Sequence, residues 1–279
     1  MTDRRPFPSR LERLPTVDST QRVVREWLAA GQPEVCVCVA DQQTAGRGRQ
    51  GRGWIAPPGA ALLLSCGFRP RGLAARHAWR LAATVSLAML DAAEEAAGLR
   101  EGTLWLKWPN DIVVDAPDGG LRKLAGVLGE AADTGRAVET VVIGIGINAD
   151  WAKEAFPVEL AGFMTSLRQV SGGRPVDREN LLEAFLDRLE PRYEALQAGH
   201  FDAGGWSTRQ RTTGREVEIL VGPEIVAGTA VGVDPERGAL LVETSEGQRA
   251  IDSGDVIRCR VLGLMPAAPD LAPDLAAGS

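Results

Sequence analysis

The chain has 279 residues, of which 31 are lysine or arginine and 37 are aspartate or glutamate, so its formal net charge is -6. A hydrophobic fraction of 44% and a charged fraction of 24% are typical of a globular protein. The longest apolar runs are far too short to cross a bilayer, and none follows Arg4 and Arg5 to form a secretory signal. Composition thus excludes a membrane-spanning helical protein and a nucleic-acid binder driven by bulk charge, and we expect a cytoplasmic protein.

Four cysteines and two histidines leave little room for metal chemistry. Cys36 and Cys38 lie two apart in an apolar run, there is no CxxC pair, and His77 and His200 are far from each other in the sequence. Zinc sites need clustered thiolates and imidazoles. We therefore expect no metal site, and we expect the cysteines to be buried thiols of a reducing compartment.

The first half of the chain predicts a strand-rich domain. The first dozen residues are expected to fray, and Ser19 or Thr20 can cap a helix that runs to about Ala30. Strands are expected at 35–40 and 61–68, on either side of a glycine- and arginine-rich loop. An alanine-rich helix over residues 77–98 ends at a glycine. Further strands are expected at 104–108, 112–114, 124–131 and 138–147, with a turn at 116–120.

The second half predicts one more helix and then a separate β unit. The helix begins at Asp177 and ends at Gly199, and Pro191 is expected to kink or split it. After about Gly214, short apolar runs alternate with turn clusters, which is typical of a small β-barrel. The strands expected there are 217–221, 226–233, 239–243 and 256–262. This divides the chain into a large domain over 1–213, a barrel over 214–265 and a disordered tail over 266–279.

Residues 46–53, GRGRQGRG, form the most distinctive local motif, which we call the arginine loop. Its glycines allow the backbone to approach a ligand closely, and Arg47, Arg49 and Arg52 supply forked donors for carboxylate or phosphate. An RGG-like nucleic-acid segment is the alternative, but this run is single, short and set between two strands. It is not a Walker loop, because the terminal Lys-Ser/Thr is missing. The motif indicates an anion-binding loop.

Two lysine motifs follow. In KWPND at 107–111, Lys107 and Asp111 are compatible with a surface ion pair, but Asp111 could equally serve a cation or a lysine that must lose its proton. Lys123 heads an apolar strand, an unusual position for a lysine that is only solvated. A lysine there can neutralise charge that develops on a phosphate or carboxylate, and Gly126 permits backbone contact with a ligand.

The segment GIGIN at 144–148 partly matches a dinucleotide-binding fingerprint. That fingerprint requires a helix at once and a second strand with an acidic end, whereas Pro157 follows here. A strand whose glycines admit a purine, with Asn148 reading the edge of the ring, fits the sequence better.

Taken in order, these motifs resemble the biotin protein ligases, also called biotin–acetyl-CoA-carboxylase ligases. The matching segments are DSTQ at 18–21, QTAGRGRQGRGW at 43–54, KWPND at 107–111, KLAGVLGE at 123–130, GIGIN at 144–148 and TSL at 165–167. The resemblance implies an α/β (α+β) fold, a mixed β-sheet flanked by helices of the class II aminoacyl-tRNA synthetase/biotin ligase type. Residues 1–213 would be the catalytic biotin- and ATP-binding domain, and 214–265 a small C-terminal SH3-like β-barrel.

The resemblance also implies a two-step activity. Biotin and MgATP would form biotinyl-5′-AMP and pyrophosphate. A specific lysine of the biotin carboxyl carrier protein of acetyl-CoA carboxylase, or of a related carboxylase, would then take the biotin. ATP and Mg2+ are the implied cofactors, no DNA or membrane partner is expected, and a homodimer is compatible with the sequence. Only about fifteen residues precede DSTQ, so we expect the DNA-binding domain of many bacterial relatives to be absent.

Site roles follow from the same resemblance. The biotin-binding residues would be Ser19, Thr20, Gln43, Arg47, Arg49, Lys123, Gly126 and Leu128. The ATP- or adenylate-binding residues would be Arg47, Arg49, Arg52, Trp54, Lys107 and Asn148. The catalytic residues would be Lys123, Arg49 and Asp111. Arg49 and Lys123 would grip the carboxylate and the α-phosphate, while Asp111 would orient or deprotonate the acceptor lysine. No residue is assigned to a metal.

Two departures and two alternatives remain. Gln21 stands where the family usually has Asn, and Gln50 replaces a frequent basic residue. A lipoate ligase or octanoyl transferase would share the catalytic fold, but its glycine-rich motif ending in an aromatic-His-Asp run is not found. A non-enzymatic anion- or nucleic-acid-binding module would use the arginine loop alone and leave the motifs of Lys107 and Lys123 unexplained.

Overall fold

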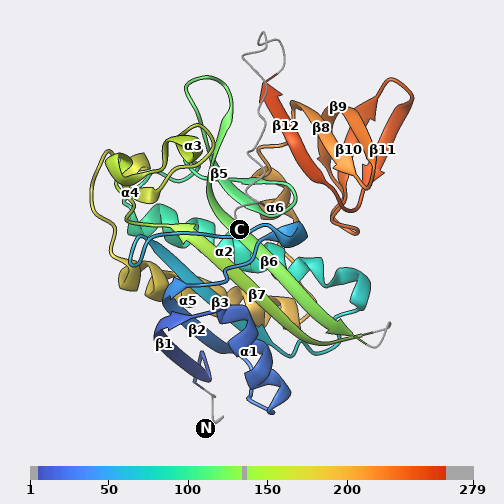
Figure 1. Ribbon diagram of the computed structural model, residues 1–279. Coiled ribbons are helices and arrows are strands. Elements are labelled where there is room, and N and C mark those ends of the chain that lie inside the picture. The colour runs from blue at the N-terminus through green and yellow to red at the C-terminus, as the bar shows by residue number, and fades with distance from the viewer. Residues whose placement is uncertain (1–5, 134–136, 262–279) are drawn as a thin grey trace.

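The computed structural model describes residues 6–133 and 137–261, which form two β-sheets and the helices around them (Figure 1). The large sheet contains β1 (Arg10–Val17), β2 (Cys36–Gln43), β3 (Ala61–Phe68), β4 (Trp105–Lys107), β5 (Asp111–Asp115), β6 (Leu121–Asp133) and β7 (Val138–Asn148). Its strand order is β1-β2-β3-β7-β6-β5-β4. The pair β1–β2 is parallel and the other pairs are antiparallel, so the expected mixed sheet is confirmed.

Helices cover both faces of the large sheet. The α-helices are α1 (Thr20–Ala29), α2 (Trp79–Ala96), α3 (Val158–Ala161), α4 (Leu167–Val170), α5 (Arg178–Gln197) and α6 (Ala203–Thr208), with 3-10 turns at Arg49–Gly51, Ala75–His77 and Lys153–Ala155. Side chains alternate across β2: Val37 and Val39 join the main core with α2 and α5, whereas Cys36 and Cys38 pack against α1. The two helical layers therefore lie on opposite faces of the sheet.

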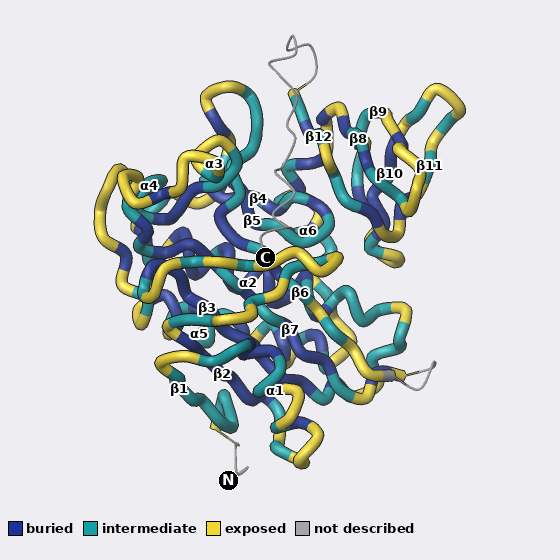
Figure 2. The backbone as a smooth tube through the Cα atoms, viewed as in Figure 1, coloured by how far each residue is buried: buried dark blue, intermediate teal, exposed yellow. Residues whose placement is uncertain are grey.

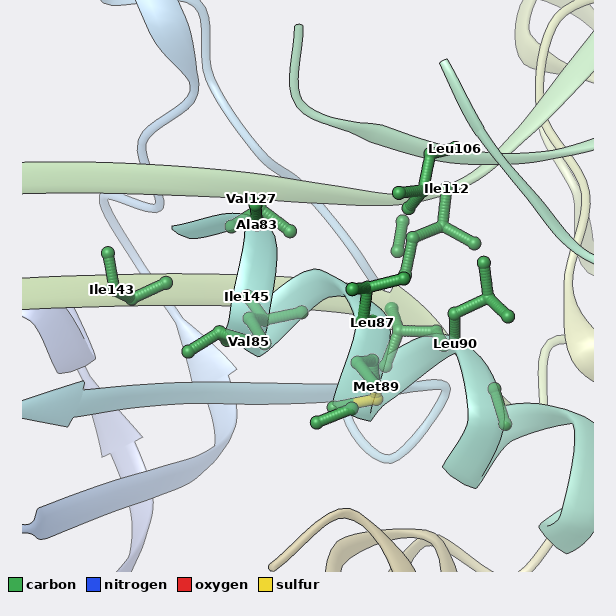
Figure 3. Close-up of a cluster of buried hydrophobic side chains, with 14 of the residues drawn as sticks. Ala83, Val85, Leu87, Met89, Leu90, Leu106, Ile112, Val127, Ile143 and Ile145 are labelled. Atoms are coloured by element: carbon green, nitrogen blue, oxygen red, sulfur yellow. The ribbon is translucent and has the colours of Figure 1, made fainter. Parts of the chain in front are cut away.

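The main core lies between the large sheet and α2. This helix is apolar on nearly all sides because the sheet covers one side and α5 the other. Figure 3 shows Ala83 and Val85 of α2 against Val127 and Ile145 of the sheet. In Figure 2, β2, β3 and β7 are buried along most of their length. No helix in the described ranges is long and apolar enough to span a bilayer.

The small sheet follows the helical region. It contains β8 (Arg215–Val221), β9 (Glu224–Val233), β10 (Leu240–Thr244), β11 (Gly247–Ile251) and β12 (Asp255–Val261), in the order β11-β10-β9-β8-β12. The expected C-terminal antiparallel unit is confirmed. Between residues 215 and 261 the edge strands β11 and β12 do not pair, so the sheet is open rather than a closed barrel. The tail expected over 266–279 lies outside the described residues.

The small sheet is tied to the large domain by specific contacts. The indole Nε1 of Trp108 donates to the carbonyl of Gly238 at 2.9 Å. Arg215, whose side chain is 5% exposed, pairs with Asp115 at 2.7 Å. These contacts join the β9–β10 turn and the start of β8 to the edge of the large sheet that carries β4 and β5.

Two expectations about local structure are wrong. The first dozen residues do not fray throughout, because β1 begins at Arg10 and Ser9 N already donates to Val35 O at 2.7 Å. The split expected at Pro191 does not occur, since α5 is a single helix over Arg178–Gln197, and the alternative of a kink there stays a prediction. Both Pro191 and Asp187 are exposed, so the carbonyl that loses its partner faces water.

Candidate active site

A pocket of about 1140 Å3 opens on the α1 face of the large sheet. Its walls are the start of α1, the arginine loop, the β4–β5 turn and the start of β12. The residues assigned to the site from the sequence that line it are Ser19, Thr20, Gln43, Arg47, Arg49, Arg52, Trp54, Lys107, Asp111, Lys123, Gly126 and Leu128. The fold thus brings together segments that lie far apart in the sequence.

Three glycines form the base of the pocket, and we call Gly126, Gly144 and Gly146 the glycine floor. Gly126 is the register partner of Gly146, and Leu128 is the partner of Gly144. The indole of Trp54 lies on this floor: a Cβ at Gly146 would meet Nε1 of Trp54 at 2.5 Å, and one at Gly126 would meet its Cζ3 at 3.2 Å. Glycine is required because any side chain would occupy the space of the indole.

One end of the pocket carries a hydrogen-bonded cluster of polar side chains. Gln43 Oε1 accepts from Thr20 N at 2.8 Å and from Thr20 Oγ1 at 3.1 Å, and Thr20 Oγ1 lies 2.8 Å from Ser65 Oγ. These bonds fix the orientation of the Gln43 amide and leave its Nε2 as a donor. The departure at Gln21 is accommodated here, since its Nε2 donates to Leu128 O at 3.2 Å.

The other end of the pocket is cationic. Lys123 Nζ lies 2.7 Å from Asp111 Oδ1 and 5.5 Å from the centre of the Trp54 ring. Lys107 Nζ donates to the carbonyl of Val256 at 3.2 Å. The β4–β5 turn aims these groups, because Lys107 and Asp111 are register partners. A Cβ at Gly126 would lie 3.1 Å from Lys123 Nζ, so the lysine also extends over the glycine floor.

The arginine loop is folded on itself above the pocket. Gly48 N donates to Arg52 O at 2.6 Å, and Trp54 N donates to Gly46 O at 3.0 Å. Gln50 adopts φ 54° at the turn, a left-handed conformation that an amide side chain tolerates better than a branched one. The loop therefore presents its guanidinium groups from a closed backbone turn.

Asn148 lies apart from the other assigned residues. It is fully buried at the end of β7, where its Nδ2 donates to Thr165 O at 2.9 Å. Its Oδ1 is buried and has no partner in the described structure. Asn148 is not part of the pocket lining, so its contact with an adenine stays a prediction.

Sequence reasoning missed several residues of the pocket. Ser65 is buried and lines the polar end, and its only sequence signal is that it interrupts the apolar run of β3. Asp255 and Val256 line the cationic end from β12, and no local motif marks them. Cys259 also lines the pocket, and burial raises the pKa of its thiol. The described residues contain no group of three or more His, Cys, Asp or Glu able to hold a metal ion.

The fold and the pocket define an α/β protein that presents a polar cluster and a cationic cluster to one pocket. The chain matches the Biotin/lipoate A/B protein ligase family over residues 14–148 and the Biotin protein ligase C terminal domain over 212–258. It is 34% identical over 238 residues to "Biotin--[acetyl-CoA-carboxylase] ligase" of Paracoccus denitrificans, covering 82% of this chain and 92% of the relative. The chain therefore belongs to the biotin protein ligase family.

Two further relatives support this assignment. "Bifunctional ligase/repressor BirA" of Bacillus subtilis is 33% identical over 242 residues, covering 86% of this chain and 71% of the relative. The structure titled "Biotin protein ligase from Aquifex aeolicus in complex with biotin and ATP" is 29% identical with a TM-score of 0.71. That comparison covers 88% of this chain and 96% of the Aquifex chain.

Proposed function

We propose that the protein is an ATP-dependent biotin–protein ligase that makes biotinyl-5′-AMP and transfers biotin to a lysine of a biotin carboxyl carrier protein. The observation that carries this proposal is the pairing of one polar and one cationic cluster at the two ends of a single pocket. Biotin has the same asymmetry, with a ureido ring at one end and a carboxylate at the other. The name of the Paracoccus relative supports acetyl-CoA carboxylase as the source of the acceptor.

The polar cluster suits the ureido ring. A ureido group presents one carbonyl acceptor and two N–H donors. Gln43 Nε2 and the hydroxyl of Ser19 supply donors for the carbonyl, while the hydroxyl oxygens of Ser19 and Thr20 can accept an N–H. A buried site built to satisfy these groups would reject an acid that lacks them, because its own polar atoms would be left unpaired.

The cationic cluster suits adenylate formation. A carboxylate oxygen of biotin attacks the α-phosphorus of ATP, the bond to the β-phosphate oxygen breaks, and pyrophosphate leaves. Negative charge grows on the phosphate oxygens during this step, and Lys123 and Arg49 stabilise it from the pocket wall. Mg2+ would enter with ATP as the MgATP substrate, where it neutralises phosphate charge.

We assign the second step to Asp111. Its carboxylate pairs with Lys123. Once Lys123 turns to the phosphate, Asp111 becomes available to orient the acceptor lysine and take its proton. The amine then attacks the carbonyl carbon of biotinyl-5′-AMP, the bond to the phosphate oxygen breaks, and AMP leaves.

ATP–pyrophosphate exchange tests the proposal. Purified protein with MgATP and labelled pyrophosphate should exchange label only when biotin is added, and addition of a carrier domain should consume the adenylate and yield biotinylated carrier. Exchange driven by lipoate or octanoate instead of biotin would assign the pocket to the related acyl ligases. No exchange with any of the three acids would favour a binding module that uses the arginine loop alone.

A further inference from the structure

The arginine loop is attached to the small sheet through one carboxylate. Arg52 Nη2 lies 2.8 Å from Asp255 Oδ2, and Arg49 Nη1 lies 3.6 Å from Asp255 Oδ1. Arg49 Nη1 also donates to the carbonyl of Gly254 at 3.2 Å. Two of the three arginines of the loop therefore share a partner in β12, and that partner lies 203 positions after Arg52 in the sequence.

The residues around Asp255 are packed rigidly against β8. Asp255 begins β12 and is the register partner of Leu220 in β8. A Cβ at Gly254 would meet Ile219 Cγ2 at 2.8 Å and Leu220 O at 3.0 Å, so the turn before Asp255 is packed tightly against β8. The Asp255 side chain is only 13% exposed and lines the pocket. The carboxylate is thus held in place by the sheet rather than by the loop.

We propose that Asp255 is a positioning residue that holds the arginine loop over the pocket, and that the small sheet acts on the chemistry through this carboxylate. The contacts of Arg52 and Arg49 with Asp255 differ in length. Arg52 makes the shorter contact and anchors the loop, whereas Arg49 makes the longer one and is free to exchange Asp255 for an anionic ligand. Asp255 does not touch the reacting atoms; it fixes where the loop presents Arg49. The catalytic part of this proposal rests on the proposed function, but the structural part does not.

The structural part of the proposal predicts how readily the arginine loop is cleaved by trypsin when no ligand is present. Asp255→Asn removes the charge and keeps the size of the side chain, so the loop should leave the small sheet more often. Tryptic cleavage in residues 46–53 of the ligand-free protein should then become about three- to tenfold faster, the effect of losing a partly exposed charge-assisted pair. Asp255→Glu should restore slow cleavage at least in part.

A matched control lies in the same sheet. Asp252 pairs with Arg237 at 2.5 Å, both side chains are more than half exposed, and neither lines the pocket. Asp252→Asn makes the same chemical change away from the loop and should cleave like the wild type. Arg52→Gln breaks the anchor from the loop side, so it should speed cleavage at the remaining sites, Arg47 and Arg49, as Asp255→Asn does, even if that variant folds poorly.

The catalytic part of the proposal predicts that the KM for ATP changes more than kcat does. In biotin-dependent exchange, Asp255→Asn should raise the KM for ATP about three- to tenfold while kcat changes less than twofold, because the reacting groups are still present. Combining Asp255→Asn with Arg52→Gln should add little to either single change, since both break one contact.

The outcomes of these experiments test the positioning role of Asp255 separately from the proposed ligase function. Equal cleavage rates for the Asp255 and Asp252 variants would overturn the positioning role. A fall in the KM for ATP of Asp255→Asn would also overturn it, because Asp255 would then be a competitor of the nucleotide. A wild type with no biotin-dependent exchange would refute the proposed function, and the proteolysis result would still decide whether Asp255 holds the loop.

Discussion

Replacement of Lys123 by alanine is the sharpest test of the adenylation chemistry. The backbone at this position is held independently of the side chain, since Lys123 N donates to Phe163 O at 2.8 Å and Thr165 N donates to Lys123 O at 2.9 Å. Lys123→Ala should therefore leave the strand in place. It removes the ammonium group that lies over the glycine floor next to Asp111.

The expected magnitude differs between catalysis and stability. Loss of one preorganised donor to a developing oxyanion costs about 2.7–4 kcal/mol, which is a fall of about 10²–10³ in kcat. The Lys123 and Asp111 side chains are 32% and 18% exposed, so solvent screens their pair. We expect a loss of only about 1–2 kcal/mol in the free energy of unfolding and a Tm about 2–6 °C lower.

A neighbouring residue supplies the control. Arg122 precedes Lys123 on β6, does not line the pocket, and pairs with Asp118 at 2.6 Å. Arg122→Ala removes a comparable charge and ion pair from the other face of the strand. It should have a similar small effect on Tm and almost none on biotin-dependent ATP–pyrophosphate exchange. Lys123→Arg should retain part of the exchange because it keeps the charge.

The reasoning fails if exchange by folded Lys123→Ala stays within about threefold of the wild type. In that case Lys123 would be a structural partner of Asp111, and the alanine and Arg122 variants would behave alike. A fall in exchange that follows the fall in Tm across all variants would point to the same conclusion.

The sequence allowed prediction of those elements whose signal is local. The apolar run that became β3 is buried along its whole length, and the runs that became β6 and β7 are also rich in apolar residues, so composition alone marks all three. Two strands escaped this reasoning. β1 is an edge strand with partial burial and a proline, and β11 is a short polar edge strand, so neither carries a clear alternation.

The residues of the candidate site also divide into those with a local sequence signal and those without one. Motifs with unusual composition, such as the arginine loop and the strand headed by Lys123, could be assigned to a ligand because their residue types fit poorly in a plain core. The pairing of Gly126 with Gly146 depends on the register of two strands, which is set by the whole sheet and not by either segment. The contact between Arg52 and Asp255 joins residues 203 positions apart, and nothing near Asp255 in the sequence marks it.

The buried thiols and the glycine floor supply two further predictions. Burial raises the pKa of Cys38 to about 12 and also raises the pKa values of the other three cysteines, which disfavours the reactive thiolate form. A chromogenic thiol reagent should label the native protein slowly and all four cysteines after denaturation; rapid native labelling would contradict the burial. Gly146→Ala places a methyl group within 3 Å of the Trp54 indole, which must leave the floor. Because glycine packing here serves the pocket rather than the core, biotin affinity measured by calorimetry should fall at least about tenfold, while Tm changes by only a few degrees. Normal affinity in this variant would show that the indole position does not shape the ligand site.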